Sequence, residues 1–265
     1  MKFFLTHLYP KEMNIYGDMG NIIALKYRLT KMGYEVVYQT LNQNCALPAQ
    51  TDFYFMGGGQ DKEQEVIYQD LLSHKSQIET DIQRGVGLLA ICGGYQLLGK
   101  SFVTGNGNLV EGLNIFPVET KSPDSSVKSR CIGNLIVDCN IPEIKNTKIV
   151  GFENHGGQTY FLDLDKMNET QKSAYSLGKV LLGFGNNSVE KLEGCVLNSA
   201  IGTYLHGSCL PKNPQLADWL IQKSLIAKAK YEENVEFKSN SSSNSLINDE
   251  ISLATQKSLI QRFLV

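Results

Sequence analysis

Hydrophobic positions in the first hundred residues fall into short apolar runs that alternate with longer amphipathic stretches. Short apolar runs bounded by turn residues predict buried strands, and spaced apolar positions predict helices. The predicted strands cover residues 3–8, 34–40, 51–56 and 86–91, and the predicted helices cover residues 22–31, 66–84 and 93–98. Strands that alternate with helices predict an α/β fold, a mostly parallel central sheet flanked by helices.

The pattern changes near residue 112, where short β-like runs follow one another with Gly, Asn and Pro between them. These runs cover residues 113–116, 133–137, 149–152, 160–162, 194–197 and 201–204. We expect them to form an antiparallel extension of the same sheet. A helix with Pro214 in its first turn is predicted over residues 214–229.

The Ser- and Asn-rich stretch 238–245 has the composition of a flexible linker, and helical spacing resumes at Ile247. We therefore expect one domain over residues 1–230, a flexible linker over 238–246 and a C-terminal helix over 247–265.

Composition reduces the number of function classes that the chain could belong to. The chain has 265 residues, is 42% hydrophobic and 20% charged, and carries a formal net charge of -2. Without a basic excess we expect no nucleic-acid partner, and without a long apolar segment no membrane insertion. Six irregularly spaced cysteines with no Cys-x-x-Cys pair indicate free thiols in a reducing cytoplasm, and no metal site is predicted.

The strongest candidate for chemistry is Cys92. It follows the apolar run 86–91 directly, and Gly93-Gly94-Tyr95-Gln96 then opens the predicted helix. This is the layout of a nucleophile elbow, a sharp strand-to-helix turn that presents one side chain. A thiol at a helix N-terminus is also activated by the helix dipole. A lone cysteine is more often a buried core residue, but this context favours a nucleophile.

Two further blocks end predicted strands. Gly57-Gly58-Gly59-Gln60 follows residues 51–56, and glycines there let backbone N–H groups approach a ligand. His206-Gly207 follows residues 201–204. Of four histidines, His206 and His155 are the candidate bases for Cys92. The carboxyl ends of parallel strands meet at one edge of a sheet, so we expect these blocks to face one crevice.

The Gly-rich loop, Cys-x-Gly-x-Gln and the late histidine together resemble class I glutamine amidotransferases, which have a flavodoxin-like fold. Finer blocks resemble their CobB/CobQ-like branch. These blocks include Asn14-Ile15-Tyr16-Gly17-Asp18-Met19-Gly20-Asn21-Ile22, Arg130-Cys131-Ile132-Gly133-Asn134, Gly151-Phe152-Glu153-Asn154-His155-Gly156-Gly157-Gln158-Thr159 and Gly202-Thr203-Tyr204-Leu205-His206-Gly207. Within that branch the blocks are most similar to the glutaminase subunits of lipid II isoglutaminyl synthase.

The resemblance implies that Cys92 is the nucleophile, that His206 is the general base, and that Arg130 binds the α-carboxylate of L-glutamine. It implies two oxyanion-hole glycines and two amides in the pocket wall: Gly58 and Gly93, and Gln96 and Asn154. It implies no cofactor in this chain. The partner would be a Mur-ligase-like subunit (MurT) that uses ATP and Mg²⁺ and acts on lipid II.

One position departs from the common pattern. Many class I amidotransferases have His-x-Glu, whereas the second residue after His206 is Ser208. We expect the third catalytic residue to come from the partner, with Glu153 and Asp218 as candidates within the chain.

Two other functions compete. In a cobyric-acid-type synthase, the ATP-using domain usually shares the chain with the amidotransferase, and we expect no phosphate-binding P-loop here. A non-catalytic scaffold would need neither Cys92, His206 nor Arg130.

Overall fold

The computed structural model describes residues 1–123, 130–162, 175–231 and 247–264. Within these residues a six-stranded sheet has the order β13-β14-β4-β3-β1-β2. Its strands are β1 (Lys2–Leu8), β2 (Glu35–Leu41), β3 (Phe53–Met56), β4 (Gly87–Ile91), β13 (Cys195–Leu197) and β14 (Ala200–Thr203). Only β13 pairs antiparallel with its neighbour, and the other four pairings are parallel. The predicted fold class, a mostly parallel sheet with helices, is confirmed.

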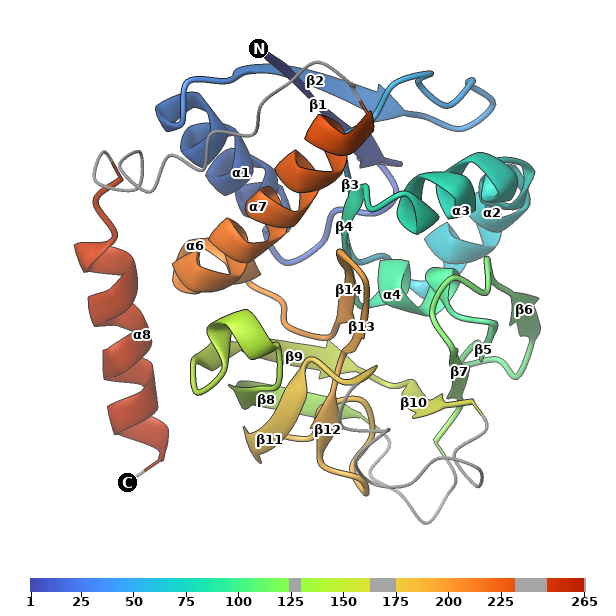
Figure 1. Cartoon of the computed structure of the whole chain (residues 1–265). Helices are drawn as coiled ribbons and strands as arrows, with labels where there is room; N and C mark the ends of the chain where they lie inside the picture. The colour runs from blue at the N-terminus through green and yellow to red at the C-terminus, as the bar shows by residue number, and fades with distance from the viewer. Residues whose placement is uncertain (124–129, 163–174, 232–246, 265) are drawn as a thin grey trace.

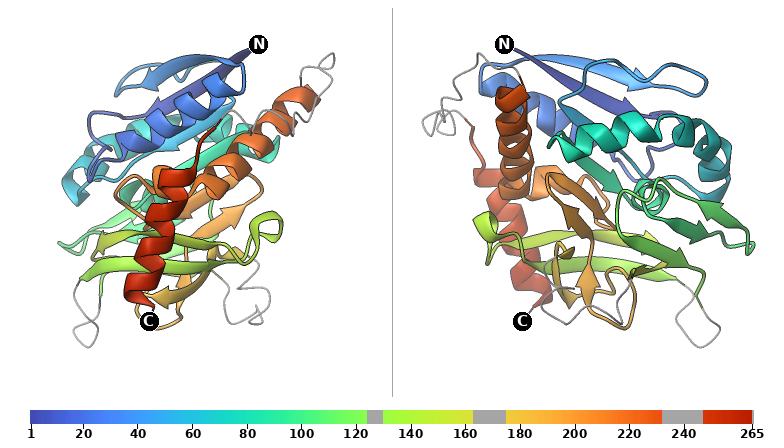
Figure 2. Two further views of the ribbon diagram at one scale, coloured as in Figure 1. Left: turned by 90° about the vertical axis from the view of Figure 1, so that its left-hand side faces the viewer. Right: turned by 45° about the vertical axis from the view of Figure 1, so that its right-hand side comes forward.

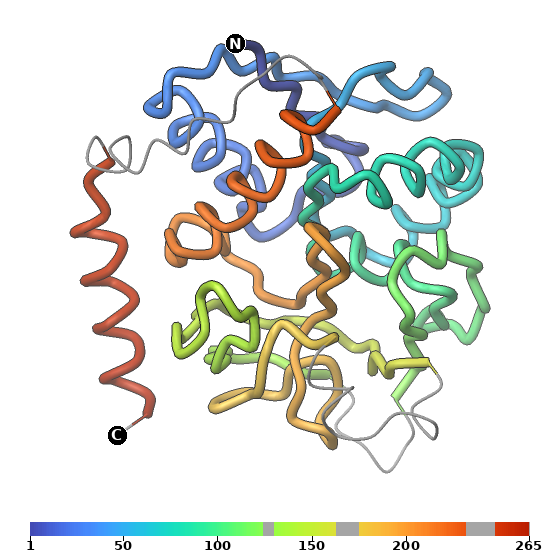
Figure 3. The backbone as a smooth tube through the Cα atoms, viewed as in Figure 1, coloured from blue at the N-terminus to red at the C-terminus, as the bar shows by residue number. Residues whose placement is uncertain are grey.

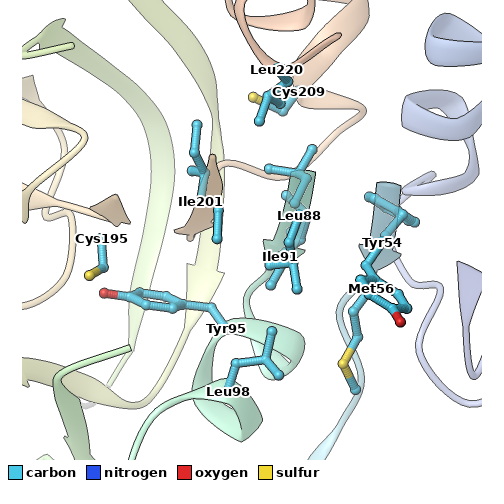
Figure 4. Close-up of a cluster of buried hydrophobic side chains, with 14 of the residues drawn as sticks. Tyr54, Met56, Leu88, Ile91, Tyr95, Leu98, Cys195, Ile201, Cys209 and Leu220 are labelled. Carbon is cyan, nitrogen blue, oxygen red and sulfur yellow. The ribbon is translucent and has the colours of Figure 1, made fainter. Parts of the chain in front are cut away.

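Helices cover both faces of this sheet (Figure 1). On one face lie α1 (Met19–Lys31), α6 (Cys209–Lys212) and α7 (Pro214–Tyr231), and on the other lie α2 (Asp61–Ser73), α3 (Lys75–Gln83) and α4 (Gly93–Leu98). Figure 4 shows Cys209 and Leu220 on one side of β4 and β14, and Tyr95 and Leu98 on the other. The central strands β3 and β4 are buried on both faces between the helical layers, which explains why their sequences are continuously hydrophobic.

The remaining strands form two smaller sheets beside the central one, visible in the turned views of Figure 2. One has the order β10-β7-β5-β6 and the other β12-β11-β8-β9. Their strands are β5 (Ser101–Val103), β6 (Leu109–Glu111), β7 (Val118–Lys121), β8 (Cys131–Cys139), β9 (Lys148–His155), β10 (Gln158–Phe161), β11 (Gly178–Leu182) and β12 (Leu192–Glu193). The expected antiparallel extension of the central sheet is thus limited to β13, and most antiparallel pairs lie in separate sheets.

Residues 113–116 are not the strand that their apolar pattern predicts. Leu113 N–H donates to Leu97 O, and Phe116 N–H donates to Leu98 O. These carbonyls end α4, where a helix leaves acceptors without intrahelical partners. The segment therefore caps a helix instead of joining a sheet.

The predicted helix 66–84 is two helices in the structure, α2 and α3, which meet at His74. The last helix, α8 (Glu250–Phe263), lies along the outside of the molecule (Figure 3). Arg28 of α1 forms ion pairs with Asp218 and with Asp249, the residue at the N-cap position of α8. The expected linker 238–246 lies outside the described residues. Every helix within the described ranges is too short or too polar to cross a bilayer.

Candidate active site

Cys92 occupies a strained turn between β4 and α4. Its backbone has φ 49° and ψ -105°, a conformation that side-chain-bearing residues rarely adopt. The turn is held on both sides, because Cys92 N–H donates to Thr203 O at 2.8 Å and Gln96 N–H donates to Cys92 O at 2.9 Å. The side chain is nearly buried, with 6% of the residue exposed. This geometry is that of a nucleophile elbow.

The Gly-rich loop after β3 packs directly against this elbow. A β-carbon on Gly93 would lie 2.9 Å from Gly59 O, and one on Gly94 would lie 2.8 Å from Gly57 O. Both distances are too short for real carbon contacts, so only glycine allows the two loops to approach this closely. The Gly93 and Gly59 backbones therefore meet beside Cys92, as the sequence predicted for the two blocks.

His206 follows β14 and lies in the same site. An antiparallel bridge with Phe152 fixes its backbone, since His206 N–H donates to Phe152 O at 2.7 Å. The Tyr16 ring packs edge-on against the imidazole, with the ring centroids 4.9 Å apart. The residue is fully buried, which keeps the imidazole in one orientation.

The charge state of His206 is set by its neighbours. Burial lowers the pKa of this imidazole, but Cys92 and the Asp18 carboxylate raise it, to about 10. The structure therefore favours a protonated His206 next to Cys92. An imidazolium beside a cysteine stabilises the thiolate, which is the nucleophilic form of the side chain.

The other candidate base, His155, makes its contacts with other groups. Its ring stacks on Tyr204 with centroids 3.7 Å apart, and its Nδ1 lies 2.8 Å from Gly157 O. Its Nε2 lies 3.5 Å from a Glu153 carboxylate oxygen. His155 thus lines the pocket with its ring nitrogens directed at Gly157 and Glu153, while His206 is the histidine whose charge state is coupled to Cys92.

A pocket of about 700 Å³ opens beside Cys92. Its lining includes Tyr16 of the N-terminal loop, Gly59 of the Gly-rich loop, Gln96 of α4, Arg130 just before β8 and Asn154 of β9. Arg130 is exposed, and its Nε donates to Asn154 Oδ1 at 2.7 Å. A guanidinium has five donors, so this bond leaves capacity for a bidentate carboxylate contact.

Gln96 forms the floor of this pocket. Its Oε1 accepts a hydrogen bond from Gln64 at 3.0 Å, and its Nε2 donates to the Tyr204 hydroxyl at 3.2 Å. Both ends of the amide are therefore held, and the side chain is 8% exposed. Gln96 and Asn154 both line the pocket.

Gly58 is where the structure departs from the roles predicted for the site. Its N–H donates to Asp18 Oδ2 at 2.7 Å, so this group does not point at an oxyanion. The neighbouring Gly59 lines the pocket with Cys92. The sequence pattern located the loop but did not show which of its three consecutive glycines lines the pocket.

The carboxylates suggested as third residues do not reach His206. Glu153 accepts hydrogen bonds from the backbone N–H groups of Phe184 and Gly185. Asp218 is paired with Arg28. The carboxylate beside His206 is Asp18, whose Oδ1 lies 3.6 Å from His206 Nδ1. The sequence gives Asp18 no catalytic role, because nothing in its local pattern connects it with a histidine so distant in the chain.

The sequence does contain one stretch with P-loop spacing, contrary to expectation: Gly94-Tyr95-Gln96-Leu97-Leu98-Gly99-Lys100-Ser101. A P-loop places its glycines between a strand and the following helix. Here Gly94 lies inside α4, and Ser101 begins β5, so the order is helix, loop and strand. The stretch is therefore not a phosphate-binding loop.

Comparison with solved structures agrees with the α/β fold described above. The structure of PurLQS from Thermotoga maritima matches with a TM-score of 0.53 and 17% identity, covering 85% of this chain and 99% of that one. At this identity the match shows the fold alone.

Sequence comparison is more specific. The family model of the CobB/CobQ-like glutamine amidotransferase domain matches residues 5–214. The chain is 36% identical to "Lipid II isoglutaminyl synthase (glutamine-hydrolyzing) subunit GatD" of Staphylococcus aureus, over 84% of this chain and 85% of that one. It is also 36% identical to the subunit of that name in Streptococcus pneumoniae, over 88% and 83%.

A more distant match is the cobyric acid synthase of Thermodesulfovibrio yellowstonii, 30% identical over 55% of this chain but only 26% of that one. The family model matches most of the chain, and the matched range includes Cys92, Arg130 and His206. This chain belongs to the CobB/CobQ-like glutamine amidotransferases.

Proposed function

We propose that this chain is the glutaminase subunit of a lipid II isoglutaminyl synthase. The observation that carries this proposal is the 36% identity to two GatD subunits along more than four fifths of the chain. A cobyric-acid-type synthase is less well supported, because its match covers about half of this chain. A non-catalytic scaffold does not account for a strained Cys92 beside a buried His206.

In the proposed reaction, L-glutamine binds with its α-carboxylate on Arg130 and its side-chain amide beside Cys92. The Cys92 thiolate attacks the amide carbon, and the N–H groups of Gly93 and Gly59 stabilise the oxyanion that forms. His206 gives its proton to the departing ammonia, which leaves a γ-glutamyl thioester on Cys92. Water, deprotonated by His206, then attacks the thioester and releases glutamate.

The ammonia would pass to a MurT-like ligase in the cytoplasm. That partner would use ATP and Mg²⁺ to activate the α-carboxylate of D-glutamate in the lipid II stem peptide, and ammonia would convert it to D-isoglutamine. The amidotransferase reaction uses only side chains and backbone groups of this chain. Among the described residues, its six cysteines form no disulfide bond, which fits a reducing compartment.

The test is reconstitution with the Mur-ligase-like subunit of the same organism. With glutamine, ATP, Mg²⁺ and lipid II, the complex should amidate lipid II. The complex containing Cys92→Ser should do so only when ammonium replaces glutamine. Amidation from glutamine by the Cys92→Ser complex would contradict the proposed role of this chain.

A further inference from the structure

The Asp18 carboxylate does not make the capping hydrogen bond that its position at the start of α1 predicts. Asp18 is the N-cap residue of α1, yet its side chain makes no capping hydrogen bond with that helix. Aspartate is common at N-caps because its oxygen satisfies the first free N–H groups. Asp18 is fully buried, and its carboxylate points away from α1 toward the candidate active site.

The backbone directly before Asp18 has an unusual conformation. Tyr16 has φ 54° and Gly17 has φ 77°, so two consecutive residues lie in the left-handed region. For the non-glycine residue Tyr16 this costs free energy, of the order of 1 kcal/mol. Strain of this kind persists where surrounding structure enforces it, and it is concentrated at functional sites.

The two carboxylate oxygens have different surroundings. Oδ2 accepts the Gly58 N–H hydrogen bond at 2.7 Å. Oδ1 lies 3.6 Å from His206 Nδ1, and within the described part of the chain neither atom has a hydrogen-bond partner. Leaving a buried polar atom unsatisfied costs about 1–3 kcal/mol. A shift of about 0.7 Å would bring the pair to hydrogen-bond distance and satisfy both atoms.

We propose that Asp18 is the positioning residue of the site: it holds the His206 imidazole with a proton on Nδ1, so that Nε2 exchanges the proton with Cys92 and with the leaving ammonia. This inference rests on the proposed glutaminase function. Asp18 does not touch the substrate and acts only through His206. The Gly58 N–H fixes the carboxylate, which gives that amide a role other than the oxyanion hole.

The surroundings of His206 favour this assignment over a carboxylate supplied by a partner. The imidazole is fully buried, Tyr16 covers it edge-on, and Asp18 lies beside Nδ1. A carboxylate from another chain would have to displace Asp18 or Tyr16 to reach that nitrogen. It would also add a second negative charge next to a buried one, which costs free energy.

The test is Asp18→Asn in the full-length chain. Asparagine has the same shape, and its Oδ1 can still accept the Gly58 N–H hydrogen bond. Its amide group would then face His206 Nδ1 as a donor and stabilise the tautomer protonated on Nε2, which cannot accept a proton from Cys92. We expect kcat for glutamine hydrolysis to fall by about 10²- to 10⁴-fold, with little change in KM.

The matched control is Asp218→Asn, which removes a carboxylate paired with Arg28 and should leave kcat unchanged. Equal kcat for Asp18→Asn and the unaltered chain would overturn the positioning role. If the unaltered chain neither hydrolyses glutamine nor reacts at Cys92 with a thiol-alkylating glutamine analogue, the proposed function fails instead.

A second measurement does not depend on activity or on the folding of the variant. Nitrogen-15 NMR of the histidines in the unaltered chain reports the His206 tautomer once the ring has lost its extra proton. A remaining proton on Nδ1 supports the assignment to Asp18. A remaining proton on Nε2 contradicts it.

Discussion

Arg130 donates its Nε–H to Asn154 Oδ1 at 2.7 Å, which fixes the guanidinium at the mouth of the pocket that contains Cys92. This bond uses only one edge of the planar guanidinium, so the remaining N–H groups can still donate hydrogen bonds to a carboxylate. Replacing Arg130 with Lys would exchange a bidentate contact for a single one. We expect KM for glutamine to rise by about tenfold to a hundredfold, consistent with a loss of about 1.5–3 kcal/mol. An unchanged KM in steady-state kinetics would show that Arg130 does not bind substrate.

Tyr16 contacts both Asn154, the partner of Arg130, and His206. Its hydroxyl accepts a hydrogen bond from Asn154 Nδ2 at 2.7 Å, while its ring packs against His206. Tyr16→Phe removes the hydroxyl and keeps the ring. We therefore expect KM to rise by about two- to tenfold, the value of one hydrogen bond, with kcat nearly constant. A large fall in kcat would mean that the hydroxyl, and not only the ring, supports His206.

Gly58 should tolerate no side chain. A β-carbon there would lie 2.8 Å from His206 Cε1 and 3.4 Å from Asp18 Oδ2. Gly58→Ala would push the imidazole out of position, so kcat should fall by at least tenfold, a loss of about 1.4 kcal/mol in transition-state stabilisation. Thermal unfolding of the same variant is the control, because a folded but slow enzyme locates the effect in the site. Full activity would show that His206 can move away without cost.

Stability should depend on pH through Glu193. Burial raises the pKa of this carboxyl to about 7, although hydrogen bonds from Thr203 and Tyr204 oppose the shift. A carboxyl whose pKa is raised in the folded state binds more protons there than in the unfolded state. Its contribution to stability is therefore complete below about pH 4.5, the ordinary value, and is lost as pH rises to about 7.

Glu193→Gln removes this titration. We expect the melting temperature of the unaltered chain to fall between pH 5 and pH 7.5, and that of the variant to change less. The size of the effect is a few kcal/mol at most. Parallel curves for the two proteins, measured by calorimetry over this range, would show that Glu193 is ionised at pH 5 in the folded protein.

The sequence predicted the parts of this site that are continuous in the chain. Cys92 was found because strand, cysteine and helix follow one another, and the Gly-rich loop because it ends a strand. Parallel β3, β4 and β14 then bring three such strand ends together. Asp18 could not be found in this way, since it reaches His206 only through the left-handed turn at Tyr16 and Gly17.

The β-rich region was harder to predict for a related reason. Apolar periodicity distinguishes strand from helix but does not identify the strand's partner. The run 113–116 therefore resembled a strand although it caps α4, and β8 with β9 could not be assigned to a sheet separate from β4. Likewise, His74 does not stand out within 66–84 as the residue that separates α2 from α3.

The measurement that tests the central claim most directly is the covalent intermediate on Cys92. The full-length chain would be mixed with L-glutamine, quenched in acid within milliseconds to seconds, and examined by intact-protein and peptide mass spectrometry, with Cys209→Ser as the control variant. A γ-glutamyl adduct on the peptide containing Cys92, present in the control and absent from Cys92→Ala, is the predicted result. Glutamine hydrolysis at the unaltered rate by Cys92→Ala would contradict the account.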